Sequence, residues 1–308
     1  MTPMLNLIIK RLLQSLITLF LIITFSFFMM RVAPGGPFDS ERRLPPEIEA
    51  NIKAKYNLDQ PLITQYLNYL SDISKGDLGL SFRYQNYTVN ELIYEGMKVS
   101  FTLGSLALLF AVLIGVPFGI LGSQKEESIL DHLIVSTTIL GISIPNFVLG
   151  PVLVMLFAII IPIFPAGGLD SVGSYVLPVF TLSIYYLSYI TRLTRIGFVG
   201  IKRREFILTA RAKGLSEPVI IFRHMLRGGI LPLVSYLGPA AAGIITGSIV
   251  IEKIFNVPGI GQHFVQGALN RDYTLVMGVV VFYSTLIITF NFLIDLVYLA
   301  LDPQVKYK

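Results

Sequence analysis

Long stretches with almost no charged side chains constrain this sequence more than any other feature. Six such runs carry at most one charge each, and they are 12–30, 101–122, 133–163, 173–191, 228–251 and 273–301. About 20 helical residues, each rising 1.5 Å, cross a hydrocarbon core of roughly 30 Å. Backbone polar groups cannot stay unpaired in lipid, and the runs lack the alternation of barrel strands. The sequence therefore predicts an all-α integral membrane protein with six transmembrane helices.

Composition excludes a soluble enzyme. Hydrophobic residues make up 54% of the 308 residues and charged residues only 14%, against about 25% charged in soluble domains. The first run follows Lys10 and Arg11 as a signal peptide would, but its 19 apolar residues exceed the usual core of about 7–15. We expect it to remain as a helix of the mature protein.

The distribution of basic residues predicts the orientation. Nine Lys and Arg side chains fall between the fourth and fifth runs, in residues 192–227. Loops rich in Lys and Arg stay on the cytoplasmic side, which places both termini in the cytoplasm. Residues 31–99 then form an external segment, with short helices beginning at Pro46 and Pro61 and a Thr88–Glu91 capping box. This segment is either a connecting loop with helical turns or a docking surface for an external partner.

A short helix is predicted in the large cytoplasmic loop, from Glu205 to Leu215. Ala210 and Ala212 favour a helix, Gly214 is placed to end it, and Pro218 suits the start of the next helix. A small-residue helix tethered between two spans has the shape to lie in a groove of another protein. The alternative is a solvated basic loop that only obeys the charge rule.

Two spans carry residues that kink helices or allow close approach. The third contains Gly141, Ser143, Pro145 and Asn146, and the fifth contains the pair Gly238-Pro239. Interrupted helices in membranes often line a pathway, and close helix packing explains the same residues equally well. Asp295 in the last span is a candidate functional group, or it reaches the interface from near the helix end.

Several chemistries lack their residues. The sequence has no cysteine, no phosphate-binding loop of the Gly-x-x-x-x-Gly-Lys-Ser/Thr type, and three widely separated histidines, His132, His224 and His263. We therefore expect no metal, no cofactor and no ATP hydrolysis by this chain. A passive pathway driven by other subunits fits best. A non-transporting membrane scaffold, or an intramembrane enzyme that uses Asp295, are the alternatives.

Several strings resemble the peptide branch of ATP-binding-cassette importers. They are 209–215 (TARAKGL), 142–145 (ISIP), 257–262 (VPGIGQ), 270–273 (NRDY) and the tail 302–303 (DP). Residues 27–38 (FFMMRVAPGGPF) and 44–47 (LPPE) resemble oligopeptide permease B subunits in particular. The chain departs from the general importer signature, because its Leu231-Pro232 lies farther from Gly214 than that signature allows.

The resemblance implies a type I importer permease in a bacterial inner membrane, moving oligopeptides or a related cargo such as dipeptides, glutathione, nickel or murein peptide. Its expected partners are a second permease subunit, two subunits that bind ATP and Mg²⁺, an external peptide-binding protein and lipid, with no nucleic acid. The expected divisions are 1–30, 31–99, 100–301 with the coupling region 192–227, and the tail 302–308.

The resemblance also implies two groups of site residues. The residues expected to couple to the ATPase are Glu205, Thr209, Ala210, Arg211, Ala212, Lys213, Gly214 and Leu215. The residues expected to shape an outer gate or to contact the binding protein are Pro258, Gly259, Gly261, Asn270, Arg271, Asp272 and Tyr273.

Overall fold

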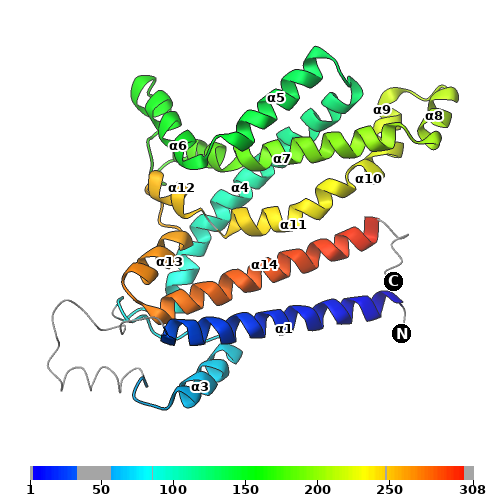
Figure 1. The fold of residues 1–308 in the computed structure, drawn as a ribbon. Coiled ribbons are helices and arrows are strands. Elements are labelled where there is room, and N and C mark those ends of the chain that lie inside the picture. The colour runs from blue at the N-terminus through cyan, green and yellow to red at the C-terminus, as the bar shows by residue number, and fades with distance from the viewer. Residues whose placement is uncertain (1–2, 33–56, 85, 247, 302–308) are drawn as a thin grey trace. The chain divides into compact units, whose positions relative to one another are not determined.

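The computed structural model describes residues 3–32, 57–84, 86–246 and 248–301 (Figure 1). Regular structure in these residues is helical, apart from one isolated bridge between Leu80 and Thr88. Contacts divide the chain into two compact units, Met1–Lys98 with Gly259–Leu286, and Val99–Pro258 with Ile287–Lys308. The predicted helix at Pro46 and the tail 302–308 lie outside the described residues. The predicted boundaries between segments of the chain, after residues 30, 99 and 301, stay predictions.

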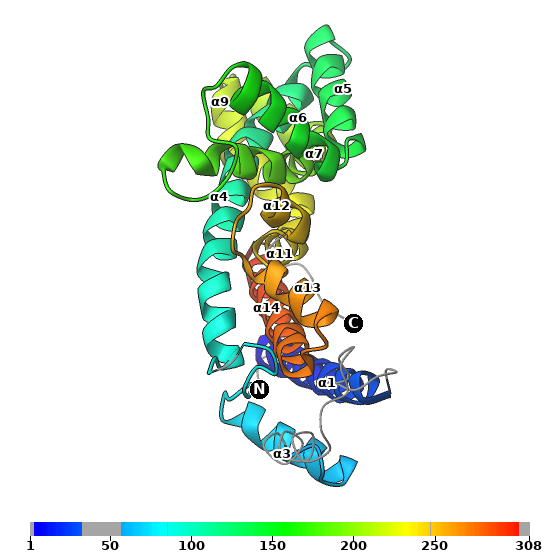
Figure 2. The same ribbon diagram turned by 90° about the vertical axis from the view of Figure 1, so that its left-hand side faces the viewer.

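The first unit contains α1 (Pro3–Val32), α3 (Leu62–Ser74) and α13 (Ile260–Leu269), with the beginnings of α4 and α14. As predicted, Pro61 precedes the first turn of α3. Helix α3 lies beside α1 (Figure 2). Phe27 of α1 is buried against the rings of Tyr66 and Tyr69 on α3. A second core joins Val89 and Ile93 to α13 and α14, and its buried members are Val89, Leu92, Ile93, Ile260, Leu275 and Val279.

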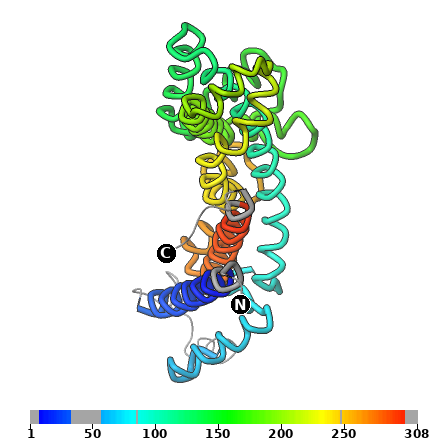
Figure 3. The backbone as a smooth tube through the Cα atoms, turned by 90° about the vertical axis from the view of Figure 1, so that its right-hand side faces the viewer, coloured from blue at the N-terminus to red at the C-terminus, as the bar shows by residue number. Residues whose placement is uncertain are grey.

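Helix α4 (Val89–Gln124) begins twelve residues before the predicted start at 101. The predicted capping box explains this start, because the Thr88 amide donates to Glu91 Oε2 at 2.8 Å and the Glu91 amide donates to Thr88 Oγ1 at 3.2 Å. The first turns of α4 contain polar residues, so the helix begins before the apolar run does. The tube in Figure 3 shows α4 as one continuous helix.

The second unit is built around α7 (Val176–Lys202), which follows a short 3₁₀ turn η2 (Val172–Tyr175). Ile190 of α7 is fully buried with Ala111 of α4 and Leu233 of α11 (Leu231–Ile245). Gly119 lets α4 approach α7 closely, since a Cβ there would lie 2.6 Å from both Thr191 O and Thr194 Cβ. Beside this core, a small residue therefore allows the backbones of α4 and α7 to approach closely.

The third apolar run is not one helix. It forms α5 (Ile129–Ser143) and α6 (Asn146–Val154), which continues into a π-helical turn η1 (Met155–Ile160), with a bend of 99° between them. Ile144 is extended because the residue before a proline avoids the helical region, and Pro145 precedes α6. The expected kink is thus a sharp break, in place of a single span 133–163.

Two other spans also differ from their predicted ends. Helix α7 runs to Lys202, eleven residues past the predicted 191, since the basic residues there are good helix formers. The run 228–251 is divided after Ile245, and the helix passes through Pro239 unbroken. Its other parts are α10 (Leu226–Gly229) and α12 (Ile249–Ile254), whereas α14 (Tyr273–Leu301) has the predicted bounds.

Among the described residues, five helices are long and apolar enough to cross a membrane, and the bent pair raises this number to six when counted as one span. The five are α1, α4, α7 with its preceding 3₁₀ turn, α11 with α12, and α14. The six predicted runs thus correspond to these five helices and the bent pair.

Candidate functional site

A short helix after α7 forms the centre of the predicted coupling region. This helix, α8 (Glu205–Ala212), has Ile207 and Ala210 on one face, three residues apart. Both side chains are buried against Phe198 of α7 and against Ile220 and Met225 of a π-helical segment, η3 (Ile220–Met225). The predicted contact residue Ala210 therefore faces the core of this chain, where it seats α8.

The predicted stop after α8 is confirmed at Gly214. This residue has φ +76°, a left-handed conformation that favours glycine. The Leu215 amide donates to Ala210 O at 3.3 Å and the Gly214 amide donates to Arg211 O at 2.9 Å. The chain then reverses into α9 (Glu217–Val219), with Pro218 in its first turn as expected.

An ion pair holds α8 and α9 across this turn. Arg211 Nε lies 2.7 Å from Glu217 Oε1, and Nη2 lies 3.2 Å from Oε2. The hydrogen bonds raise the pKa of Arg211 and lower the pKa of Glu217, so both stay charged at neutral pH. Parallel bonds of this kind fix orientation as well as distance. Arg211 thus links α8 to α9 within this chain.

The opposite face of this region exposes large apolar side chains. Leu208 of α8 is 56% exposed and Phe222 of η3 is 69% exposed. Phe206, Leu215 and Val219 are also exposed, as are the predicted Glu205, Thr209, Ala212, Lys213 and Gly214. Apolar groups gathered at the end of a polar loop indicate a surface that another protein covers.

Ionic contacts join the neighbouring helix ends. Lys202 Nζ donates to Ser123 O at 3.0 Å and to Gln124 O at 2.9 Å, which satisfies two free carbonyls at the end of α4. Arg195 of α7 forms two hydrogen bonds with Asp131 of α5, whose side chain is 4% exposed. These contacts therefore join α7, the helix that precedes α8, to α4 and to α5.

The predicted pathway residues are not gathered into one surface. Gly141 packs against Ser188 of α7, and Gly238 is buried, with Ile294 of α14 2.9 Å from the position of a Cβ. Close packing accounts for these two glycines. Ser143, Pro145 and Pro239 are exposed and Asn146 is partly exposed.

A tyrosine cluster was missed at the sequence level. Tyr189 of α7 stacks on Tyr236 of α11 with ring centroids 5.6 Å apart, and Tyr185 lies 4.9 Å from Tyr189 and 5.4 Å from Tyr186. The spacing Tyr185–Tyr189, one helical turn, was the available signal.

One of the predicted outer residues, Asp272, is a buried carboxylate. Asp272 is fully buried and accepts hydrogen bonds from residues far before it and just after it in the sequence. Its donors are Ser81 Oγ, the amides of Phe82, Arg83 and Leu275, and Thr274 Oγ1. Asp272 therefore fastens the 81–83 segment to the start of α14.

The other predicted outer residues differ in exposure. Arg83 Nε donates to Asn270 O at 2.8 Å, which strengthens the same joint. Arg271 is exposed with φ +56°, and Tyr273 is buried. Gly259 precedes α13 and Gly261 is buried within it, while Pro258 is exposed. Of this group, Pro258 and Arg271 are the most accessible to a partner.

Comparison with known proteins gives the family. The family model described as "Binding-protein-dependent transport system inner membrane component" matches residues 115–307, and the model of the corresponding N-terminal part matches residues 4–93. The oligopeptide transport system permease protein OppB of Haemophilus influenzae is 49% identical over 306 residues, covering 99% of this chain and 100% of that protein.

Two further likenesses agree with this assignment. The dipeptide transport system permease protein DppB of Bacillus subtilis is 42% identical over 298 residues, 97% of each chain. A solved structure of the MetNI methionine ABC transporter in inward-facing conformations has a TM-score of 0.56 at 18% identity, covering 68% of this chain and 96% of that chain. The expected type I importer permease fold is thereby confirmed. The chain belongs to the family of binding-protein-dependent transport system inner membrane components, as a permease subunit of an ATP-binding-cassette importer.

Proposed function

We propose that this chain imports oligopeptides across a bacterial inner membrane, together with a second permease subunit, two ATPase subunits and an external peptide-binding protein. The cargo class is supported by relatives at 47–49% identity that are named oligopeptide permeases and are matched over their full length. Peptide backbones are polar, and each unpaired group would cost several kcal/mol in lipid. Such a cargo needs a protein-lined path.

The exposed face of α8 supports the coupling role. Ile207 and Ala210 pack into the core of this unit, so the exposed face of α8 stays in one orientation. Leu208, Phe222 and Val219 then present apolar surface that a groove of an ATPase would cover. The docking proposal rests on this observation: one face of α8 is buried in this chain, and the other exposes apolar side chains. ATP and Mg²⁺ belong to the partner subunits in this scheme.

The same surface agrees with the proposed orientation. Lys202, Arg203 and Arg211 lie at the α8 end of α7, and basic residues concentrate on the cytoplasmic side. Both termini are then cytoplasmic, and the Asp272 joint lies outside. Tyr185, Tyr189 and Tyr236 lie within helices long and apolar enough to cross a membrane. We assign them to the peptide path, because their rings and hydroxyls suit backbones of varied sequence.

The docking role is tested with a substitution that changes only the outward face. Leu208→Ser is expected to reduce co-purification of the ATPase subunits about tenfold or more, because a buried leucine contributes roughly 1.5–3 kcal/mol. Val172→Ser is the matched control, since Val172 is 88% exposed at the other end of the α7 region. Equal retention of the ATPase by wild type and Leu208→Ser would contradict the docking surface.

The transport role is tested separately in proteoliposomes. The assembled importer is expected to accumulate labelled oligopeptide only with ATP and the binding protein, and this chain alone is expected to accumulate none. Uptake by the isolated chain would overturn the scheme. A preference for dipeptides, which the 42% identical relative favours, would appear as competition by dipeptides but not by longer peptides. A scaffold role predicts unchanged uptake when Tyr189 and Tyr236 are replaced by alanine.

A further inference from the structure

Helix α3 of the first unit presents three different surfaces around its axis. The first packs on α1, the second exposes apolar side chains, and the third exposes polar side chains. Residues three, four and seven positions apart share one face of a helix, and each surface repeats with this spacing. The coupling region and the tyrosine cluster use none of these surfaces.

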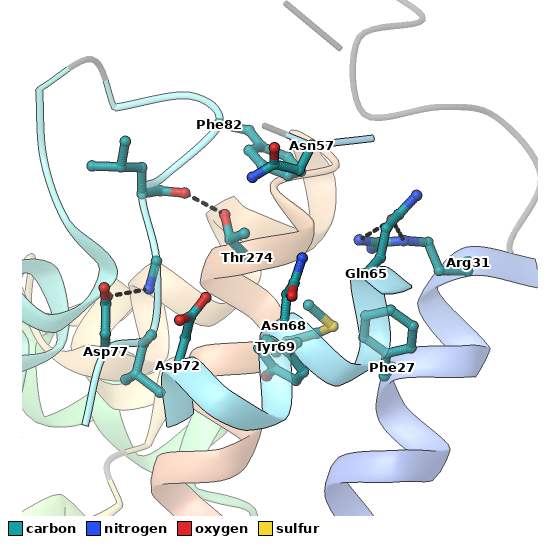
Figure 4. Close-up of a pocket in the computed structure, with 14 residues that line it drawn as sticks. Phe27, Arg31, Asn57, Gln65, Asn68, Tyr69, Asp72, Asp77, Phe82 and Thr274 are labelled. Carbon is teal, nitrogen blue, oxygen red and sulfur yellow. Dashed lines mark hydrogen bonds between the residues drawn. The ribbon is translucent and has the colours of Figure 1, made fainter. Parts of the chain in front are cut away.

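Aromatic rings and hydrogen bonds fix the surface of α3 that packs on α1. The centroid of the Tyr66 ring lies 5.3 Å from that of Phe27, and the Tyr66 hydroxyl lies 2.7 Å from Thr24 Oγ1. Arg31 Nε and Nη2 each lie 3.2 Å from Gln65 Oε1, and Figure 4 shows these two side chains pointing toward one another. Helix α3 therefore has a defined height along α1.

This height is the boundary of the membrane. The candidate span of α1 is the 25 residues Ile8–Val32, which measure about 37 Å and exceed a hydrocarbon core of roughly 30 Å by about 7 Å. Phe27 precedes Val32 by about 7.5 Å along the axis, and Thr24 precedes it by about 12 Å. Even with the whole excess beyond this end of α1, Phe27 lies at the edge of the hydrocarbon and Thr24 lies within it. Figure 1 shows α3 beside the end of α1 that is farther from the N mark.

The apolar surface of α3 consists of Leu62, Ile63 and Leu67. Ile63 is 61% exposed and Leu67, one helical turn later, is 58% exposed, while Leu62 is 42% exposed. In the turns of α1 that α3 contacts, Phe25 and Met29 are also exposed. Gathered apolar side chains of this size indicate a surface that meets an apolar medium. At the height of Phe25 and Met29, the medium beside a spanning helix is lipid.

The polar surface of α3 consists of Thr64, Asn68, Ser71 and Asp72, all of them exposed. Asn68 and Asp72 also line a cavity of about 220 Å³ (Figure 4). The 13 residues of α3 include no Lys or Arg, and Asp72 lies 3.9 Å from Lys75 just beyond the helix. The helix therefore lacks the basic side chains that attract anionic lipid headgroups, and its affinity for a bilayer would come from the apolar surface.

We propose that α3 is an interfacial helix, whose apolar surface enters the acyl chains of the bilayer while its polar surface stays in water. Hydrocarbon and water meet at the height where α3 packs on α1, so the lipid boundary supplies both environments that the two exposed surfaces need. Helices of this kind bury their apolar face about 5–10 Å into the boundary of headgroups and acyl chains. Helix α3 then holds the external segment on the membrane. In the proposed orientation this is the outer leaflet, and only the choice of leaflet rests on the proposed function.

Spin labels on single introduced cysteines test this placement, because the chain has no cysteine of its own. Ile63→Cys and Leu67→Cys label the apolar surface, and Thr64→Cys and Ser71→Cys are the matched controls on the polar surface of the same helix. The importer is assembled with cysteine-free partner subunits in phosphatidylcholine bilayers. Oxygen, which concentrates in acyl chains, should relax the labels at 63 and 67 more than a water-soluble nickel chelate does. The order should be reversed at 64 and 71, and the label at 67 should lie about 5–10 Å below the phosphates.

Two results at positions 63 and 67 would overturn the proposal. Stronger relaxation by the nickel chelate would place the apolar surface in water, and protection from both reagents would show that a protein surface covers it. Bilayers with added phosphatidylglycerol should give unchanged values, because α3 carries no basic side chain. Deeper labels in the anionic bilayers would contradict an attachment through apolar side chains. ATP-driven peptide uptake by the same preparations separates a failure of this inference from a failure of the proposed function, because the accessibility of the labels does not depend on transport.

Discussion

Arg195 of α7 and Asp131 of α5 form a bidentate ion pair, with Nε 2.5 Å from Oδ1 and Nη2 2.6 Å from Oδ2. Asp131 also accepts the Glu127 amide at 3.0 Å. The Asp131 side chain is 4% exposed and that of Arg195 is 24% exposed, so water replaces neither partner fully. The pair therefore joins two helices whose apolar faces alone leave their relative position less well determined.

Arg195→Ala is expected to destabilise the protein by about 3 kcal/mol, because it leaves a buried carboxylate without its main partner. Thermal unfolding in detergent measures this loss. Arg203→Ala is the control, since Arg203 binds Glu126 at 2.6 Å but is 72% exposed, and such pairs contribute less than about 1 kcal/mol. Equal losses for the two variants would contradict the structural importance of the buried pair.

Gly214→Ala is expected to weaken coupling to the ATPase. Its φ of +76° costs an alanine about 1–2 kcal/mol, although a Cβ would meet nothing within 4 Å. Gly76 is a matched control, with φ +79° and equally open surroundings, in the turn after α3. Peptide uptake and ATPase retention should fall for Gly214→Ala and stay unchanged for Gly76→Ala. A similar fall for both variants would mean that general backbone strain, and not the α8 turn, is responsible.

Asp272→Ala is expected to cost about 3 kcal/mol or more, since three backbone amides and two hydroxyls lose their acceptor. Asp272→Asn keeps one oxygen acceptor and should cost less. Thermal unfolding measures which of the two variants is less stable. Limited proteolysis of residues 75–84 reports whether this segment is released. A larger loss for Asn than for Ala would contradict this account of the joint.

Gly119→Ala is expected to destabilise the protein by about 1–3 kcal/mol, because its Cβ would lie 2.6 Å from Thr191 O on a neighbouring backbone. Gly200→Ala is the matched control in α7, where a Cβ meets nothing within 4 Å and where alanine is the better helix former. We expect the control to be neutral or up to about 1 kcal/mol stabilising. Both effects are read from thermal unfolding.

His263 makes stability depend on pH in a stated direction. Burial in α13 lowers its pKa below the ordinary 6.5, with Glu95 acting in the opposite sense. The folded state therefore binds its proton less readily than the unfolded state. Stability should be constant above about pH 7 and should fall below pH 6.5, by at most about 1.4 kcal/mol per pH unit.

His263→Gln should remove this part of the acid sensitivity. The measurement is the difference in melting temperature between about pH 7.5 and pH 5.5, compared for wild type and variant. Identical differences for the two proteins would show that other groups control the acid response. The centroid of the Tyr84 ring lies 6.2 Å from that of the His263 ring. Tyr84 should keep its position in wild type and in the variant.

Local signals were sufficient for much of the fold. The run ending at Leu301, with Asp295 as its single charge, predicts α14 with its observed bounds. Pro61 predicts the start of α3, and Gly214 predicts the end of α8. Each of these features depends on a few neighbouring residues, through hydropathy, a missing amide hydrogen or a left-handed turn. Such constraints are visible in a single sequence.

Other features depend on residues far apart in the chain. Asp272 and Ser81 are 191 positions apart, and Arg195 and Asp131 are 64 apart, so no local pattern reveals either pair. The extension of α7 to Lys202 was missed for a related reason, because hydropathy marks the end of the apolar run and not the end of the helix. The burial of Ala210 depends on Phe198 and Met225, which are distant in sequence, so local spacing alone does not predict it.

The seating of α8 separates stability from recognition in this part of the chain. Ile207 and Ala210 fix the helix, while Leu208 and Ala212 make no contribution to its core. If α8 docks the ATPase as proposed, a substitution at the second pair should change ATPase binding without altering the folding of the permease. The proposed docking role then implies that a few surface replacements would be enough to redirect the subunit to a different ATPase.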